Sequence, residues 1–384
     1  MTRELVFHLG DHKTGTTSIQ DTLRRKNWDG AVPSVSFVTS GFQHSDIAKA
    51  VTHGGLTVRR QHDLVDWAAR VRTEPADIAV ISSEAFESAD PELLRAALQD
   101  LAPDLAAGVR LIAYVRPHAD RVLSSYAERV KLGIYTGNLT EFVDQLNANN
   151  RFHYLGRFTR WRSVFGTRFE LRPMIRSLLH EQCVVRDFLS FAFNSRDFTL
   201  KSNPDANESL SVEDLAILLE LHRCLGDSAR KNKSAQSIGR NYALLLATMP
   251  QQTATKLALS AATYAKVRQL FAADAEALDH SFFSGSPMSD ALQAAAHRTV
   301  AETQSVRAED HYPPDEVRMM RSLAGLVAQM ASYAPDAWVQ HFTQLRLGTA
   351  PPEGAGDPAR SKPAKAKTAQ HRPADQRKKT AHRS

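Results

Sequence analysis

Short apolar runs alternate with amphipathic stretches over the first half of the chain. The runs are rich in β-branched and aromatic residues, as is typical of parallel strands that are buried on both faces. They predict strands at Leu5–Leu9, Val35–Val38, Ile78–Ser82, Arg110–Val115 and Phe169–Arg172. Strands that are separated by helices indicate a parallel sheet with helices on both faces.

Amphipathic segments lie between these strands, and some carry helix-capping signals. They predict helices at Thr16–Arg25, His62–Val71, Pro91–Leu101 and Ala119–Leu132. Asp90 stands at the N-cap position of the third helix, which begins with a proline, and Gly133 follows the fourth helix as its C′ residue.

The strand signals end near Asn203, and only helical patterns follow. Ser211 and Asp214 form a capping-box pattern at the start of a helix. Further helices are expected at Gln236–Ala247, Thr253–Ala273 and Pro313–Ser332. The chain therefore divides into an α/β core at 1–203, a helical extension at 204–347 and a tail at 348–384.

The net charge of +6 belongs to the tail and not to the rest of the chain. Nine of the 48 Lys and Arg residues and three of the 42 acidic residues lie between Pro351 and Ser384, which leaves 39 of each sign elsewhere. Since the tail also lacks large apolar side chains, we expect it to be disordered. A neutral body argues against specific binding of nucleic acid, so its basic groups are expected to act at defined sites.

Three further patterns bear on where the protein resides. No stretch reaches the roughly 18 consecutive apolar residues of a membrane-spanning helix. The first apolar run is too short for a secretory signal peptide. Two cysteines, Cys183 and Cys224, cannot form a disulfide framework. We therefore expect a cytoplasmic protein without a transmembrane segment, and its oligomeric state stays open.

The first predicted strand leads into a loop with the sequence HLGDHKTGTTS, residues 8–18. A tight glycine loop before a helix N-terminus favours an anion, because backbone N–H groups and the helix dipole point at it. Lys13 adds a full positive charge, and the hydroxyl groups add further donors. We expect a bound anion to contact Lys13, Thr14, Gly15, Thr16, Thr17 and Ser18.

Gly10 and Gly15 have the spacing of a Walker A loop, which binds nucleotide phosphates. A Walker A loop has a lysine directly after its second glycine, whereas this chain has Thr16 there and its lysine two residues before Gly15. The displaced pattern, Lys-x-Gly-Thr-Thr after a strand, resembles the 5′-phosphosulfate-binding loop of sulfotransferases that use PAPS (3′-phosphoadenosine-5′-phosphosulfate). The alternative is a polar turn that uses a Thr or Ser as the N-cap of the helix.

A second motif follows the predicted strand Arg110–Val115. Arg116 stands at the carboxyl end of this strand, where ligands bind in open α/β sheets, and Ser124 follows eight residues later. A guanidinium group and a hydroxyl group suit a phosphate. Arg-x7-Ser after a strand resembles the 3′-phosphate-binding element of the same family, with Arg121 and Tyr126 at family-like positions. The family usually has Asn-Pro after the arginine, whereas this chain has Pro117 and His118, so its proline stands one place earlier.

The resemblance implies a P-loop-like α/β fold, PAPS as the sulfonate donor, and an acceptor hydroxyl or amine that we expect to belong to a carbohydrate. Lys13 would then serve the departing phosphate. Sulfonate transfer also needs a base for the acceptor's proton. Glu84 follows the predicted strand Ile78–Ser82 closely and should emerge at the same sheet edge as Lys13 and Arg116; glycan-modifying members commonly use a glutamate. Glu128 is the reserve candidate.

The sequence has no group of residues with metal-ligand spacing, and we interpret His8 and His12 as structural, so no metal is expected. Two other functions stay open. One is a P-loop-type kinase of a small molecule, which Thr16 disfavours, and the other is a non-catalytic module that binds a nucleotide. The acceptor substrate is the partner that the sequence leads us to expect.

Overall fold

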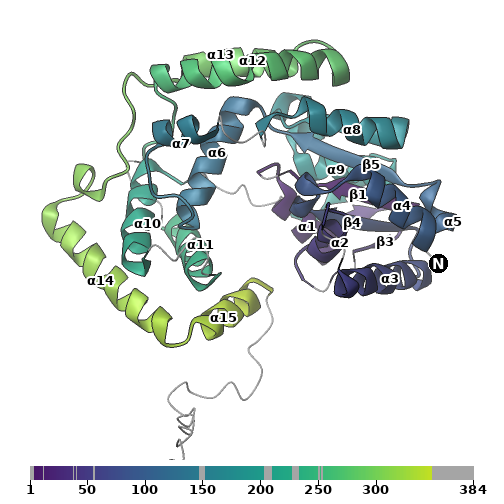
Figure 1. The fold of residues 1–384 in the computed structure, drawn as a ribbon, viewed down its shortest axis with the longest axis horizontal. Coiled ribbons are helices and arrows are strands. Elements are labelled where there is room, and N and C mark those ends of the chain that lie inside the picture. Colours follow the sequence, from purple (N-terminus) through teal and green to yellow (C-terminus); the bar gives the residue numbers. More distant parts are fainter. Residues whose placement is uncertain are drawn as a thin grey trace, which may run out of the picture.

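A computed structural model describes residues 4–347, apart from 12, 38, 40, 55–56, 147–151, 203–209, 227–232, 250 and 252–253. His12, Val38, the predicted boundary at 203–204 and the tail at 348–384 lie outside the described residues. The rest of the chain forms a parallel sheet flanked by helices, followed by an all-helical C-terminal part (Figure 1). The predicted class, a P-loop-like α/β fold with a helical extension, is confirmed.

Five parallel strands form the central sheet in the order β3-β4-β1-β5-β6. Their bounds are β1 Glu4–Leu9, β3 Val35–Ser36, β4 Ile78–Ser83, β5 Arg110–Val115 and β6 Phe169–Pro173. The register pairs Phe7 of β1 with Ile81 on one side and with Leu111 on the other. The strands that the apolar runs predict are therefore the strands of the sheet.

Alternate side chains of each strand enter two separate hydrophobic cores. Leu5 and Phe7 belong to one core, and Val6 belongs to the other. The first core is covered by α3 (Val58–Thr73), α4 (Pro91–Leu101), α6 (His118–Lys131) and α8 (Leu155–Phe165). The second is covered by α1 (Thr16–Arg25) and α9 (Val184–Phe193). Helices cover both faces of the sheet, which explains why apolar and polar residues do not alternate along its strands.

Capping residues define several helix ends as the sequence predicts. The Asp90 carboxylate accepts hydrogen bonds from the first backbone N–H groups of α4. Ser211 and Asp214 form the capping box of α10 (Val212–Leu225). Gly133 follows α6 with a φ of 65°, a left-handed conformation that favours glycine.

Several shorter elements connect the sheet and its helices, and the strand pair β2–β7 is one that the sequence analysis missed. They are β2 Trp28–Gly30, α2 Ser45–Ala50, the 3-10 helix η1 Glu84–Ser88, α5 Pro103–Ala106, α7 Leu139–Leu146, the 3-10 helices η3 Gly166–Arg168, η4 Arg176–Leu178 and η5 His180–Gln182, and β7 Phe198–Leu200. Strands β2 and β7 pair with each other in antiparallel fashion, outside the main sheet.

The C-terminal part continues the first core. After α10 it consists of α11 Lys233–Thr248, α12 Ala261–Phe282, α13 Pro287–Ala294, η7 Ala295–Arg298, η8 Ala308–Asp310, α14 Pro314–Tyr333 and α15 Pro335–Leu347. The predicted helix Thr253–Ala273 begins later, because Ser260 caps α12. Helix α6 lies between the sheet and α10 (Figure 1), and Phe271 of α12 shares the core of Tyr126. Among the described helices, none is long and apolar enough to cross a membrane.

Candidate functional site

The carboxyl end of β1 lies at the centre of the sheet, between the ends of β4 and β5. The chain passes from β1 to β3 and β4 on one side and then crosses to β5 on the other. A reversal of this kind opens a crevice at the carboxyl ends of the strands. The loop after β1, the turn that begins with Glu84 and the segment at Arg116 therefore converge there.

The loop between β1 and α1 is tightly packed and depends on two glycines. A Cβ atom at Gly10 would lie 3.0 Å from the carbonyl oxygen of Ser83, and one at Gly15 would lie 2.6 Å from a methyl group of Val184. Gly15 has a φ of 79°, and Lys13 also has a positive φ, of 68°. Two left-handed residues this close together curl the backbone sharply just before the helix.

Gly15 is the N-cap of α1, so no side chain of the cap accepts a hydrogen bond from the first turn of this helix. The alternative interpretation, a turn capped by Thr or Ser, is therefore wrong. The Thr14 hydroxyl is buried and donates to the carbonyl oxygen of Asp11 at 2.7 Å, which holds the loop together. Thr16 is also buried, whereas Thr17 is exposed and Ser18 is half-buried.

Asp11 anchors this loop in a buried network of four charged side chains. Its carboxylate binds Arg121 at 2.9 Å and Arg157 at 2.8 Å. Glu87 binds the same two arginines at 3.2 and 3.3 Å. Two carboxylates thus neutralise two guanidinium groups drawn from α6 and α8. Sequence reasoning missed this network, since its members lie far apart along the chain and only Asp11 and Arg121 stood in recognised motifs.

Lys13 and Glu128 form an ion pair, with 3.1 Å between Nζ and Oε2. Lys131 pairs with the same carboxylate oxygen. Burial alone would raise the pKa of the Glu128 carboxyl, but the two ammonium groups outweigh it and lower this pKa to about 2. Glu128 is thus a firmly ionised counterion of Lys13 and Lys131.

Helices α10 and α11 reach the same part of α6 from the C-terminal half. The His222 ring lies 3.0 Å from the Lys131 carbonyl oxygen. Burial lowers the pKa of the Lys131 ammonium group, and the nearby cations Lys13 and Arg240 lower it further. Arg240 of α11 therefore adds positive charge close to the Lys13–Glu128 pair.

Arg116 meets the loop directly, because its Nη1 group donates to the carbonyl oxygen of Lys13 at 3.0 Å. The Tyr154 hydroxyl donates to the carbonyl oxygen of Arg116 at 2.9 Å and fixes its backbone. Burial lowers the pKa of the Arg116 guanidinium. Ser124 lies on α6 and donates to the Arg121 carbonyl oxygen at 3.2 Å. The two predicted motifs are in contact, although 103 residues separate them in the chain.

Glu84 begins the 3-10 helix that follows β4, as its position after an apolar strand predicts. Its backbone N–H donates to Oε1 of Gln43 at 2.9 Å. The residue lines a hollow of about 380 Å³ together with Thr17 of α1. The other lining residues are Gln20, Gly41, Phe42, Gln43, Ser45 and Asp46. Glu84 and Thr17, one of the predicted anion contacts of the loop between β1 and α1, therefore face the same space.

His8 is buried beneath the loop, where its Nδ1 atom lies 2.8 Å from the Ser82 hydroxyl. Burial lowers the pKa of the His8 ring to about 3, so the ring is neutral at ordinary pH. The structural interpretation of His8 agrees with this position. In the described part of the chain, no group of three or more His, Cys, Asp or Glu side chains could hold a metal ion.

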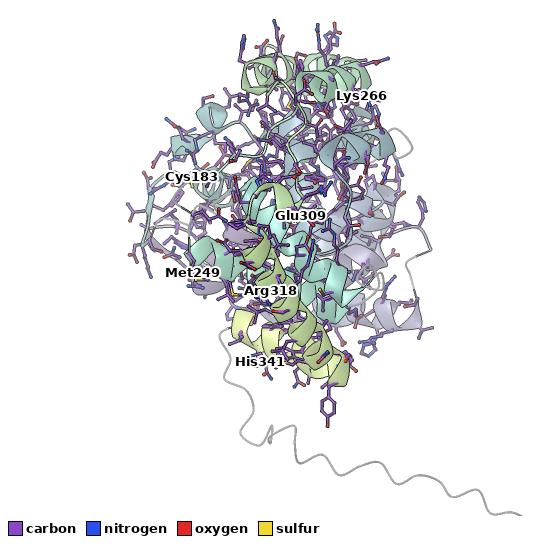
Figure 2. All side chains as sticks on the ribbon, turned by 90° about the vertical axis from the view of Figure 1, so that its left-hand side faces the viewer. Cys183, Met249, Lys266, Glu309, Arg318 and His341 are labelled. Carbon is purple, nitrogen blue, oxygen red and sulfur yellow. The ribbon has the colours of Figure 1, made fainter. Side chains whose placement is uncertain are left out.

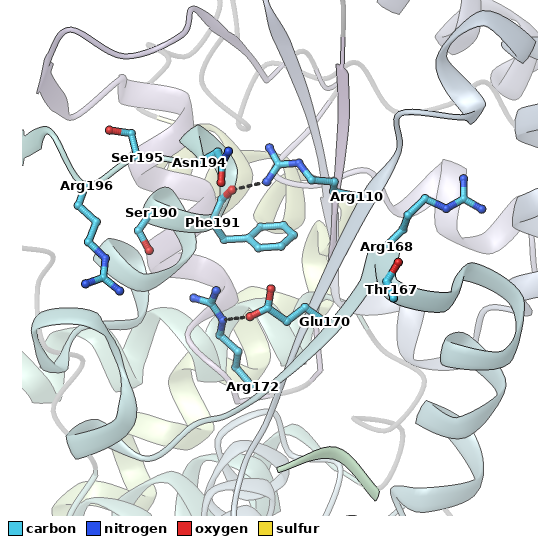
Figure 3. Close-up of a pocket in the computed structure, with 10 residues that line it drawn as sticks. All are labelled: Arg110, Thr167, Arg168, Glu170, Arg172, Ser190, Phe191, Asn194, Ser195 and Arg196. Carbon is cyan, nitrogen blue, oxygen red and sulfur yellow. Dashed lines mark hydrogen bonds and ion pairs between the residues drawn. The ribbon is translucent and has the colours of Figure 1, made fainter. Parts of the chain in front are cut away.

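A second hollow, of about 430 Å³, lies between β6 and the carboxyl end of α9 and contains none of the predicted site residues (Figure 3). It is rich in arginine, but three of its four arginine side chains, those of Arg110, Arg168 and Arg172, already have protein partners. Arg110 pairs with Glu4 and donates to the Ala192 carbonyl oxygen, and Arg172 pairs with Glu170 and Asp187. We therefore place the candidate site at the loop between β1 and α1 and not in this hollow.

Comparisons with known proteins give weak similarity to solved structures alone. No family model and no curated protein matches the sequence. Among solved structures, a sulfotransferase from Alicyclobacillus acidocaldarius is similar with a TM-score of 0.38 and 16% sequence identity, over 57% of this chain and 91% of that one.

Proposed function

We propose that this protein is a sulfotransferase that moves a sulfonate group from PAPS to a hydroxyl or amine of a carbohydrate. The contact between Arg116 and the backbone of Lys13 carries the proposal. It joins the two elements that resemble the 3′-phosphate and 5′-phosphosulfate sites of PAPS-dependent enzymes, at one edge of one sheet. PAPS supplies an activated sulfonate on a 5′-phosphate, and the residues of this chain have to hold both phosphates.

The loop between β1 and α1, which we call the phosphate loop, fits an anionic donor. The first backbone N–H groups of α1 follow a glycine cap, and the exposed Thr17 hydroxyl stands beside them. We assign this end of α1 and Lys13 to the 5′-phosphosulfate, where positive charge stabilises the departing phosphate. We assign Arg116 and Ser124 to the 3′-phosphate. Glu128 holds the Lys13 ammonium group at this edge until a phosphate oxygen competes for it.

Glu84 is our candidate for the general base. A carboxylate whose pKa is about 2 is a weak base, which argues against Glu128. Glu84 instead lines the hollow beside Thr17, and its backbone is fixed by Gln43. In the transfer, the acceptor oxygen or nitrogen bonds to sulfur, the bond from sulfur to the 5′-phosphate oxygen breaks, and the acceptor's proton passes to Glu84.

We place the acceptor in the hollow next to Glu84. Gln43, Ser45 and Asp46 line it with hydrogen-bonding groups, and Phe42 adds an aromatic ring. A few polar groups beside an aromatic surface suit a sugar, which presents hydroxyl groups on its rim and C–H groups on its face.

A small-molecule kinase is the second candidate, and it differs in the nucleotide that it binds. Thr16 occupies the place of the Walker lysine, which argues against a kinase. Isothermal titration of the full chain with PAP (3′-phosphoadenosine-5′-phosphate), ATP and GTP separates the two functions. We expect PAP to bind and the two triphosphates to bind far more weakly. Binding of ATP without binding of PAP would favour the kinase, and binding of none of the three would contradict both.

Transfer from labelled PAPS to a panel of saccharides then tests the reaction. Lys13→Ala should lower turnover by about 10²-fold or more, as expected when one preorganised charge donor to a departing group is lost. Lys266→Ala is a matched control. Lys266 also pairs with a single carboxylate, that of Asp144, but it lies on α12 and not in the phosphate loop. Near-normal turnover of Lys13→Ala would refute the assignment of the loop.

A further inference from the structure

Helix α14 has two apolar faces, and the described residues cover only one of them. Val317, Ala324 and Ala331, spaced seven residues apart, are buried against the protein. The other face carries five large apolar side chains, which we call the outer stripe. They are Met319, Leu323, Leu326, Met330 and Tyr333, which are 55%, 57%, 53%, 50% and 74% exposed. The helix forms the outer rim of the C-terminal part, and Figure 2 looks directly at it.

The spacing along the outer stripe is four, three, four and three residues. This alternation defines the apolar seam of a coiled coil, in which two helices pack along their length. A helix face meant for solvent is instead polar and charged. Five large apolar residues in heptad spacing on an exposed face are therefore the pattern of a helix that packs against another helix.

Charge does not oppose such packing. Between Met319 and Tyr333 the one charged residue is Arg321. Its guanidinium group is held on the inner side of the helix by Glu220, at 2.9 Å, and by Glu309. Ser322 and Gly325 lie on the same helix between stripe residues and are small, so a partner can approach closely. Two copies of the stripe would meet without repulsion.

The residues outside the described ranges offer no apolar segment that could cover the stripe. Residues 348–384 contain no Val, Ile, Leu, Met, Phe, Trp or Tyr. The other residues outside the described ranges contain just three, Met1, Val38 and Leu56, which lie far apart in the sequence. An apolar helix face suits an apolar occupant, and these residues do not supply one.

We propose that the outer stripe of α14 is the interface of a homodimer. A second copy of the stripe supplies the missing occupant with matching heptad spacing, and a two-fold axis near Leu326 lets each stripe cover the other. The five side chains expose about 500 Å² on each copy, hence about 1,000 Å² in the dimer, which is the lower limit for a specific interface. Since interfaces near this limit are typically weak, we expect the dimer to dissociate at about micromolar concentrations.

Sedimentation equilibrium of the full chain at about 1 to 100 μM tests the proposal. We expect a reversible monomer–dimer equilibrium for the wild type and a monomer at all concentrations for the double variant Leu323→Glu and Leu326→Glu. The matched control is Leu244→Glu with Leu245→Glu, which places the same charges on exposed leucines of α11 and should still dimerise. Circular dichroism melts should show unchanged folding, because all four side chains are more than half exposed.

A wild type that stays monomeric at 100 μM would overturn the proposal, and so would a stripe variant that still dimerises. If only the α11 control lost the ability to dimerise, the interface would lie elsewhere and the proposal would be overturned as well. Leu326→Cys provides a test that does not depend on the folding of the glutamate variant. A short bismaleimide should cross-link Leu326→Cys into dimers and leave the wild type, with its free Cys183 and Cys224, monomeric. Absence of the cross-link would contradict an axis near Leu326.

Discussion

Two glutamates lie near the phosphate loop, and their surroundings differ. Glu128 is paired with Lys13 and Lys131, which lower its pKa to about 2 from the ordinary value of 4.5. Its stabilising effect on the fold is therefore complete above about pH 4.5 and is lost as the pH falls toward 2. Glu84 lines the hollow in which we place the acceptor. We therefore propose that Glu84 takes the acceptor's proton and that Glu128 positions Lys13.

Glu84→Gln should lower turnover by about 10²- to 10⁴-fold, because the amide keeps the shape of the side chain but cannot take a proton. Affinity for PAP should stay nearly unchanged. The acid limb of the pH–rate profile should disappear with the carboxylate. Glu128→Gln is the matched comparison, and it should keep any acid limb that the wild type shows above about pH 4.5. If Glu84→Gln were fully active and Glu128→Gln inactive, Glu128 and not Glu84 would be the general base.

Elements whose signals are local could be predicted from the sequence. Helices α1 and α4 have the predicted bounds, and the capping box of Ser211 and Asp214 lies where it was expected. The pairing of β2 with β7 could not be predicted, because its partners are more than 160 residues apart and each strand has three residues. Likewise, α8 begins without a side-chain cap of its own. Its first backbone N–H groups are instead satisfied by Asp274, which lies 120 residues away.

Asp274 of α12 joins three elements, and this contact predicts a stability effect. Its carboxylate accepts hydrogen bonds from the backbone N–H groups of Tyr154 and Leu155 and lies 3.0 Å from the buried ring of His118. Asp274→Ala leaves these groups without a partner and should lower the free energy of unfolding by about 2–4 kcal/mol. Urea denaturation measures this change. Glu276→Ala, at an exposed position of the same helix, should change it by less than about 0.5 kcal/mol. Equal stability of the two variants would contradict this role of Asp274.

Across the whole molecule, the site depends on the order of the strands. The sequence pointed to both segments that we propose bind phosphate, because each is a short segment at the end of an apolar strand. It could not identify the Asp11–Arg121–Glu87–Arg157 network or the ion pair of Lys13 with Glu128, since these contacts arise only when β4, α6 and α8 are packed around β1. The strand order brings Lys13 and Arg116 together and leaves Glu84 on the opposite side of the loop.

We propose that one edge of this sheet binds a nucleotide with two separate phosphate groups. Calorimetric titration of the wild type and of Arg116→Ala, with PAP and with AMP, which lacks the 3′-phosphate, tests it most directly. Arg116→Lys serves as the control that keeps the charge. We predict that Arg116→Ala weakens PAP by about 2–4 kcal/mol, or roughly 30- to 700-fold, because a charge-assisted phosphate contact is lost. It should weaken AMP much less. An equal loss of affinity for both nucleotides, or no loss for either, would contradict the assignment of Arg116 to the 3′-phosphate.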